Sequence, residues 1–324
     1  HGVAWLPDSS AVITSAARHE TWDLDLALDL YLVPLDADER PEHVRALTAH
    51  DGECSQPSVS PDGKHVAFIG HEGLLTLPVN EHVGIVPIGN SPTPAAAITW
   101  SSKGFDRTFY SILGARPPVW ESASSLLAVA EDRGDTHLYR LAADGSDAPE
   151  RLTSGALSVS RYDAAEGTIA TIRTTIDRPG VLFVGEEQRS DVSADFADGM
   201  LSWEKFAVPT TDGTDEIDAW IMRPANFDAS ATYPVLLNVH GGPFTQYGEY
   251  FFDEAQMQAA AGFVVVMGNP RGGSGRHTDW GQSILGPKHP CLLYTSPSPR
   301  DLNPNLGWRV LREKRGGGGG GGGG

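Results

Sequence analysis

The sequence predicts two regions of different architecture, an all-β region over residues 1–203 followed by an α/β region over residues 204–290. The first region consists of short alternating apolar and polar segments that Pro, Asp, Gly and Ser interrupt, a pattern typical of antiparallel strands. It shows no long helical periodicity. The second region contains two continuous apolar strands with a helix-compatible segment between them, which predicts a parallel pair of strands.

A recurring phrase divides the first region into similar units. Residues 45–48 read Arg-Ala-Leu-Thr and residues 151–153 read Arg-Leu-Thr. After the first phrase, a Ser-Pro-Asp-Gly-Lys turn at residues 60–64 precedes an apolar strand at residues 65–69, and its Pro and Gly set the turn geometry. Such internal repetition predicts blades of four strands, each about 40–50 residues long.

We therefore expect residues 1–203 to form a partial β-propeller of about four blades. The best-defined unit contains hairpin strands at residues 126–130 and 137–141 and closes with a turn at residues 143–145. An ordinary β-sandwich with chance repetition is the alternative interpretation.

The second region begins with a hairpin. Residues 206–209 and the alternating strand at residues 217–222 flank an Asp212-Gly213 turn. The next elements are expected in the order strand, helix, strand, at residues 234–240, 251–261 and 263–267.

Composition excludes several classes of protein. The 324 residues are 40% hydrophobic and 8% aromatic, with a mean hydropathy of −0.24, which is unlike collagen, coiled coils or disordered chains. The 24 basic and 42 acidic residues give a net charge of −18, so we expect no nucleic-acid partner. Because no run of 18 or more apolar residues occurs, we also expect no membrane partner.

Both ends of the sequence look unlike natural termini. Residue 1 is His, and the first residues read as the interior of a repeat, so we expect a truncated start. Residues 291–301 match, codon by codon, the translation of a transposase-type sequencing adapter, and residues 316–324 are all glycine. We therefore expect residues 291–324 to be a non-native tail. A Pro/Ser-rich linker followed by a glycine linker is the alternative.

Cysteine usage weakly favours a reducing compartment. Cys291 falls in the expected tail, which leaves Cys54, and one cysteine cannot form an internal disulfide. We therefore expect a cytoplasmic location.

The segment His240-Gly241-Gly242-Pro243 directly follows a predicted buried strand. Glycines there allow a tight turn and expose backbone N–H groups, which can stabilise a developing oxyanion, as the corresponding loop of α/β-hydrolases does. A plain glycine turn is the alternative.

A second glycine-rich segment, Asn-Pro-Arg-Gly-Gly-Ser-Gly at residues 269–275, follows the next buried strand. The order of these features, propeller, Asp-Gly turn, His-Gly-Gly-Pro and then Asn-x-Arg-Gly-Gly-x-Gly, resembles the prolyl oligopeptidase family of serine peptidases, particularly its acylaminoacyl-peptidase and dipeptidyl-peptidase-like members. The resemblance is strongest over residues 204–290. It implies that these residues are the N-terminal part of an α/β-hydrolase domain.

The resemblance also implies a Ser, Asp, His triad, yet no Gly-x-Ser-x-Gly elbow occurs in the chain. The near miss around Ser274 lacks the final Gly, and in the family the elbow comes one strand later. We therefore expect the three triad residues beyond Pro290. Four other polar residues precede the family's nucleophile position and are expected to be surface or loop residues: Asp253, His277, Asp279 and His289.

Two further residues take roles by analogy with the family. At the position of His240 other members carry a Tyr whose hydroxyl helps to bind the oxyanion, so His240 is a candidate for the same role. The backbone N–H groups of Gly241 and Gly242 are the alternative donors. Arg271 either pairs with a carboxylate to hold its loop or lines the substrate cleft.

We expect no metal or other cofactor, because no His-x-x-x-His, Cys-x-x-Cys or phosphate-loop spacing occurs. The acidic group Asp23, Asp25 and Asp29 could bind a substrate amine, but a solvated strand face is the preferred interpretation.

The sequence thus predicts a fragment of a serine peptidase that cleaves short peptides through an acyl-enzyme, with the fragment itself inactive. An esterase on the same fold and a non-catalytic, propeller-bearing binding protein are the alternatives.

Overall fold

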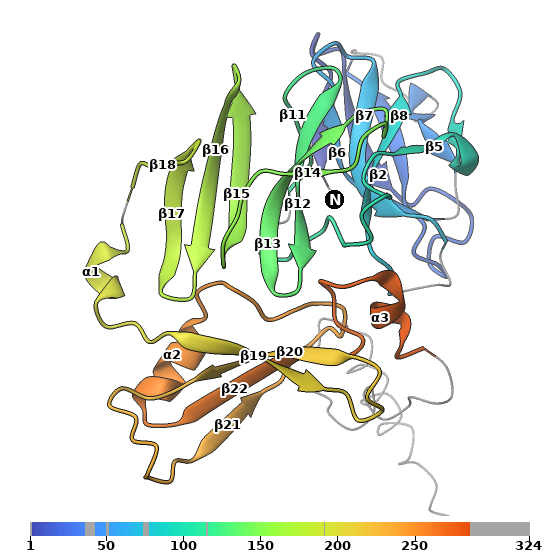
Figure 1. Ribbon diagram of the computed structural model, residues 1–324. Helices are drawn as coiled ribbons and strands as arrows, with labels where there is room; N and C mark the ends of the chain where they lie inside the picture. Colours follow the sequence, from blue (N-terminus) through green and yellow to red (C-terminus); the bar gives the residue numbers. More distant parts are fainter. Residues whose placement is uncertain are drawn as a thin grey trace, which may run out of the picture.

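The computed structural model describes residues 2–35, 43–49, 52–73, 78–114, 116–190 and 192–285 (Figure 1). Its elements fall into a repeat region, strands β1 to β18, and a C-terminal region that begins with helix α1. The expected tail at residues 291–324 and His289 lie outside the described residues.

The repeat region contains four antiparallel units of four strands each. The first is β1 (Val3–Trp5), β2 (Ala11–Ala16), β3 (Asp29–Pro34) and β4 (Arg45–Ala46). The second is β6 (Glu53–Val59), β7 (His65–His71), β8 (His82–Pro87) and β10 (Thr99–Trp100). The short parallel pair β5 (Thr48–Ala49) and β9 (Thr93–Pro94), with the 3-10 helix η2 (Ala95–Ala97), lies beside them.

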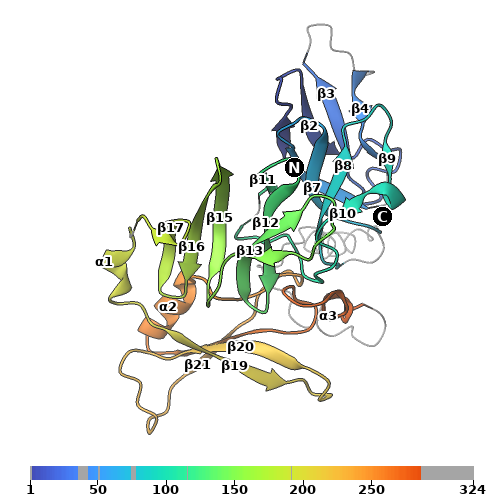
Figure 2. The ribbon, with the colours of Figure 1, turned by 45° about the horizontal axis from the view of Figure 1, so that its top comes forward.

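The third unit is β11 (Val119–Trp120), β12 (Ser125–Asp132), β13 (Asp135–Ala142) and β14 (Glu150–Arg151). The fourth is β15 (Ser158–Ala165), β16 (Thr168–Thr175), β17 (Arg178–Val184) and β18 (Glu187–Gln188). A single parallel pairing of Thr136 with Ser158 joins these two units into one sheet. Figure 2 shows the units following one another in chain order above the C-terminal sheet, and within the described residues they do not close into a ring.

The Ser-Pro-Asp-Gly-Lys turn joins β6 to β7 as its residues predict. Gly63 has a φ of +70°, a conformation that strains any other residue. The Asp62 carboxylate accepts hydrogen bonds from the Ser60 hydroxyl at 2.7 Å and the Lys64 N–H at 3.1 Å. The turn therefore closes the hairpin through local contacts alone.

The C-terminal region is a four-stranded sheet with short helices. Its elements are α1 (Ala194–Ala197), β19 (Trp203–Pro209), β20 (Glu216–Met222), β21 (Val235–Asn238), α2 (Asp253–Ala260), β22 (Val264–Asn269) and α3 (Thr278–Gln282). The strand order is β19-β20-β22-β21, in which β21 runs parallel to β22 and the other pairs are antiparallel. Strand, helix and strand thus form the parallel pair that the apolar pattern predicts.

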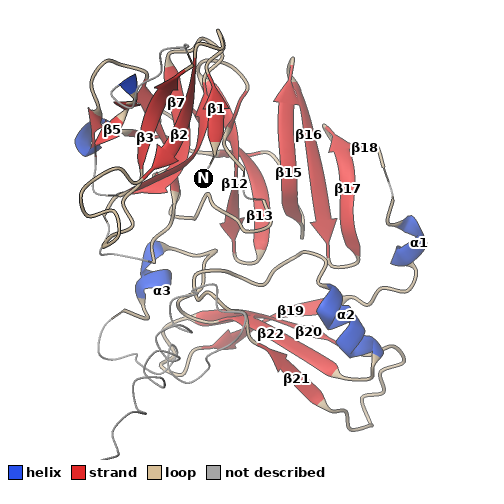
Figure 3. Ribbon diagram, turned by 180° about the vertical axis from the view of Figure 1, so that it is seen from behind, coloured by secondary structure: helices blue, strands red, loops and turns tan. Residues whose placement is uncertain are grey.

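Helix α2 covers one face of this sheet and separates it from the β16–β17 hairpin (Figure 3). The core beneath it contains Trp220, Met222, Val265 and Met267, all at most 1% exposed. Strand β21, at the edge of the sheet, leaves apolar side chains in solvent, with Leu237 67% exposed. The sheet is therefore buried on its β20–β22 side and uncovered along β21.

None of the helices formed by the described residues has the length and apolar composition needed to cross a bilayer.

Candidate active site

The loop after β21 presents two glycine amides. Gly242 has a φ of +129°, and a Cβ there would lie 2.9 Å from the Phe244 nitrogen, so only glycine fits without a shift. Among the described residues, no group accepts a hydrogen bond from the N–H of Gly241 or Gly242. Both amides are therefore available as donors at the carboxyl end of the parallel strands.

The His240 side chain lies against this loop. Its Nδ1 is 2.9 Å from the Gly241 carbonyl oxygen, and its ring meets the Tyr247 ring edge-on, with 5.3 Å between centroids. Burial lowers the pKa of His240 below its usual value, so the ring is neutral at pH 7. A carbonyl only accepts hydrogen bonds, so Nδ1 carries the proton and Nε2, which has no partner among the described residues, is an acceptor. The neutral ring therefore supports the loop, and its unprotonated Nε2 cannot donate a hydrogen bond.

The two glycine-rich loops lie side by side. The Asn269 side chain closes a pair of hydrogen bonds with the Tyr247 backbone, accepting from its N–H at 2.7 Å and donating to its carbonyl at 2.8 Å. The Ser274 N–H donates to the Thr245 carbonyl at 3.0 Å. Because β21 and β22 are parallel, their carboxyl ends bring these loops together, as the motif order predicts.

Arg271 has carboxylate partners in the turn between β19 and β20. Its guanidinium makes two hydrogen bonds to Asp212, at 2.6 and 3.0 Å, and lies 3.4 Å from Asp215. The bonds to Asp212 raise the pKa of Arg271 and hold the pKa of Asp212 well below its usual range. Arg271 thus pairs with a carboxylate that holds its loop, and a role for it in a substrate cleft stays a prediction.

Ser274 lies in neither an elbow nor a triad. Its side chain is buried and hydrogen-bonded to the Glu131 carboxylate of β12. Asp253 and Asp279 are exposed helix residues, and His277 caps α3 by accepting from the Trp280 N–H. These residues are not brought together.

The acidic residues near the start of the chain hold local structure. Asp25 accepts hydrogen bonds from His19 and from the Ala27 N–H, and Asp29 accepts one from the Thr48 hydroxyl, while Asp23 is exposed. Within the part of the chain that the structure describes, no group of three or more His, Cys, Asp or Glu side chains could hold a metal ion.

A cavity of about 370 Å³ lies between the repeat region and the loop after β21. Its lining combines acidic, imidazole and apolar side chains: Glu53, His71, Pro78, Val79, Glu81, Pro243, Phe244, Ile284 and Leu285. Burial, together with the charges of Glu53 and Glu131, raises the pKa of Glu81 to about 8. Apart from Pro243, no sequence motif marks these residues, because they converge from separate segments of the two regions.

Glu131 of β12 lies outside the lining of this cavity and is buried, at 5% exposed. Burial raises its pKa to about 7, against the opposing effect of the hydrogen bond from the Ser274 hydroxyl. A carboxyl whose pKa is higher in the folded chain stabilises the fold fully below its ordinary value of 4.5. That contribution is lost as the pH rises through about 7.

Replacing Glu131 with Gln is therefore expected to flatten the loss of stability between about pH 4.5 and pH 7, by at most about 1.4 kcal/mol per pH unit. Urea unfolding followed at a series of pH values measures this slope. Equal slopes for the variant and the unchanged chain would contradict the assignment of a buried, protonated Glu131.

Comparison with known proteins relates this chain to peptidases. Over 179 residues it is 30% identical to the uncharacterized peptidase YuxL of Bacillus subtilis, covering 52% of this chain and 27% of that protein. It is 27% identical over 271 residues to the probable dipeptidyl-peptidase 5 of Emericella nidulans, covering 76% and 35%. The acylaminoacyl peptidase of Pyrococcus horikoshii has a similar structure, with a TM-score of 0.69 and 19% identity over 88% of this chain and 42% of that one. No family model matches.

The chain is thus a relative of peptidases in sequence and shares their fold. The resemblance to the prolyl oligopeptidase family that its motifs predict is confirmed. The chain spans about a third of the length of the curated relatives it matches.

Proposed function

We propose that this chain is part of a serine peptidase that cleaves short peptides, of the acylaminoacyl or dipeptidyl type, through an acyl-enzyme. In this proposal residues 1–203 are a partial β-propeller and residues 204–290 are the N-terminal part of an α/β-hydrolase domain. The observation that carries it is the pair of glycine amides, Gly241 and Gly242, at the carboxyl end of β21, which have no acceptor among the described residues, in a chain related to peptidases.

These two amides fit the stabilisation of a tetrahedral intermediate. When a nucleophile attacks a peptide carbonyl, the carbonyl oxygen becomes an oxyanion that needs fixed hydrogen-bond donors. Loss of one such donor typically raises the barrier by about 2.7–4 kcal/mol. The backbone supplies the donors here, while His240 and Asn269 hold the loop that carries them.

The cavity beside Phe244 supports a peptide substrate. Its lining includes Pro243 and Phe244, which directly follow the two glycines in the sequence. It also includes Glu53, His71 and Glu81 of the repeat region. A short peptide would therefore contact both regions, and apolar and acidic side chains would both line its path.

The chain as it stands is expected to have no serine hydrolase activity. No Gly-x-Ser-x-Gly occurs in it, and the buried Ser274 hydroxyl donates a hydrogen bond to the Glu131 carboxylate. The purified chain should not react with a fluorophosphonate probe or hydrolyse p-nitrophenyl esters and aminoacyl p-nitroanilides. A Ser274→Ala variant serves as the control. Covalent labelling that this substitution abolishes would show that Ser274 is a nucleophile and would contradict the proposal.

The peptidase assignment itself is tested by reading the source DNA onward from the codon for Pro290. The proposal expects another strand followed by Gly-x-Ser-x-Gly, with Asp and His further along. If the template instead carries the codons for Cys291 to Gly324, a non-catalytic binding protein becomes the better interpretation.

A further inference from the structure

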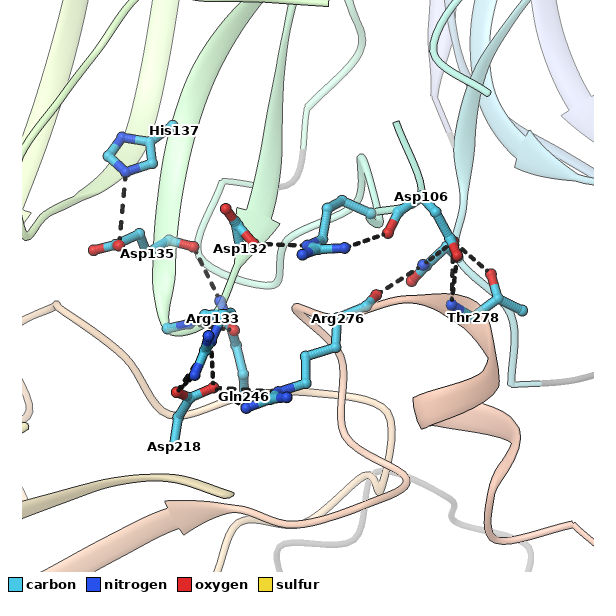
Figure 4. Close-up of polar contacts among 12 residues, drawn as sticks. Asp106, Asp132, Arg133, Asp135, His137, Asp218, Gln246, Arg276 and Thr278 are labelled. Atoms are coloured by element: carbon cyan, nitrogen blue, oxygen red, sulfur yellow. Dashed lines mark hydrogen bonds and ion pairs between the residues drawn. The ribbon is translucent and has the colours of Figure 1, made fainter. Parts of the chain in front are cut away.

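The tip of the β12–β13 hairpin reaches from the repeat region into the loop after β21 (Figure 4). The Gln246 side chain receives it. Its Oε1 accepts a hydrogen bond from the Gly134 N–H at 2.8 Å, and its Nε2 donates to the Asp135 carbonyl oxygen at 3.2 Å. Gln246 is 8% exposed, so these bonds form away from water.

Neighbouring residues of the same loop are fixed by the C-terminal sheet. The Thr245 carbonyl accepts from the Ser274 N–H, and the Tyr247 backbone pairs with the Asn269 side chain. Three consecutive residues, 245 to 247, therefore have three separate anchors. Gln246 is the one whose side chain is held by the repeat region.

Tyr247, the third of these anchored residues, is connected to residues 240–242 through side-chain contacts. The Tyr247 ring lies edge-on to the His240 ring, and His240 in turn is hydrogen-bonded to Gly241. A displacement of residues 245–247 would move the surface on which His240 packs. The orientation of the glycine amides therefore depends on contacts made several residues later in the loop.

We propose that Gln246 is a positioning residue, through which the β12–β13 hairpin tip sets the conformation of residues 240–242. The catalytic meaning of this coupling rests on the proposed function. The coupling itself, a contact in the repeat region that controls a loop of the C-terminal region, does not.

Hydrogen exchange on the full chain tests the coupling. Gln246→Met keeps the side-chain volume and removes both hydrogen bonds to the hairpin tip. The matched control is Thr278→Val, which removes the 2.8 Å hydrogen bond from the Thr278 hydroxyl to Asp106, another contact between the two regions that does not touch the loop.

We expect amide exchange over residues 240–247 to rise by roughly tenfold in the Gln246 variant, the factor that a lost buried hydrogen bond produces. Exchange there should stay unchanged in the Thr278 variant, and exchange in β6 and β7 should stay unchanged in both. Unchanged exchange over residues 240–247 in the Gln246 variant would overturn the proposal, as would an equal rise throughout the chain.

The imidazole of His240 gives a second readout that a purely structural role of Gln246 would not move. Its nitrogen NMR shifts report the tautomer and the pKa. In the unchanged chain we expect the Nδ1–H form and a lowered pKa, and in the Gln246 variant a pKa that returns toward 6.5. An identical titration in both chains would contradict the coupling.

If Gln246→Met does not fold, Gln246→Glu tests the same coupling, because it removes the amide that donates to the Asp135 carbonyl while it keeps an acceptor for the Gly134 N–H. A rise in exchange limited to residues 240–247 would support the proposal, and no rise would overturn it. Neither exchange nor titration requires a nucleophile, so a failed peptidase assignment leaves these results interpretable.

Discussion

Asp218→Ala is expected to lower the free energy of unfolding of the C-terminal region by about 3–5 kcal/mol. The Asp218 side chain is 3% exposed and accepts hydrogen bonds from Arg133 of the β12–β13 tip at 2.7 Å and from Arg276 at 2.8 Å (Figure 4). Removing the carboxylate leaves two guanidinium groups facing each other, and Arg276 is only 12% exposed. Urea unfolding followed by tryptophan fluorescence measures the loss.

The control for this prediction is Glu204→Ala, which breaks the exposed ion pair with Arg223. Such a pair contributes roughly 0–1 kcal/mol. Burial opposes ionisation of Asp218, but the two arginines hold its pKa below the usual value, so its contribution is present above about pH 4 and is lost as the pH falls through the folded pKa. Equal effects of the two substitutions would show that the buried pair contributes no more than a surface one.

Gly248→Ala is expected to force the two regions apart where the hairpin tip docks. A Cβ on Gly248 would lie 1.8 Å from the Gly134 carbonyl oxygen, which also accepts a hydrogen bond from the Glu249 N–H at 2.8 Å. The backbone cannot yield here, because Gly134 itself packs on the Trp220 ring. We expect a loss of about 3 kcal/mol, the upper end for overpacking, together with a larger radius of gyration in X-ray scattering.

Gly199→Ala is the matched control for this substitution. It introduces the same methyl group in the same region, where no atom of the described residues lies within 4 Å of the new Cβ. Its scattering curve and stability should match those of the unchanged chain. If Gly248→Ala also left both unchanged, the tight docking of the tip would be wrong.

Features set by local sequence could be predicted well. The turn at residues 60–64 closes through Asp62 and Gly63, and the apolar runs form β21 and β22, although both strands differ slightly in length from the expectation. The expected helix at residues 251–261 begins instead at Asp253. Tertiary contact explains the delay, because the Phe251 N–H donates to the Thr174 hydroxyl of β16.

The candidate site could be predicted only where glycine marks it. The loop at residues 240–243 carries a motif with a local cause, whereas Gln246 and Asn269 carry none. Arg133 and Gly134 read as an ordinary hairpin turn, and their partners lie in another region. Glu131 ends an apolar strand, and only the packing of Ser274 against it reveals a buried acid.

The docking of the hairpin tip also sets an order of events during synthesis. Gly134 and its partner Gln246 are separated by 112 positions in the chain. At a translation rate of about 5–20 residues per second, the tip leaves the ribosome roughly 6–22 s before its partner exists. During that interval Arg133 and Gly134 face solvent or a chaperone, so the repeat region must hold its hairpin unaided until the second region arrives.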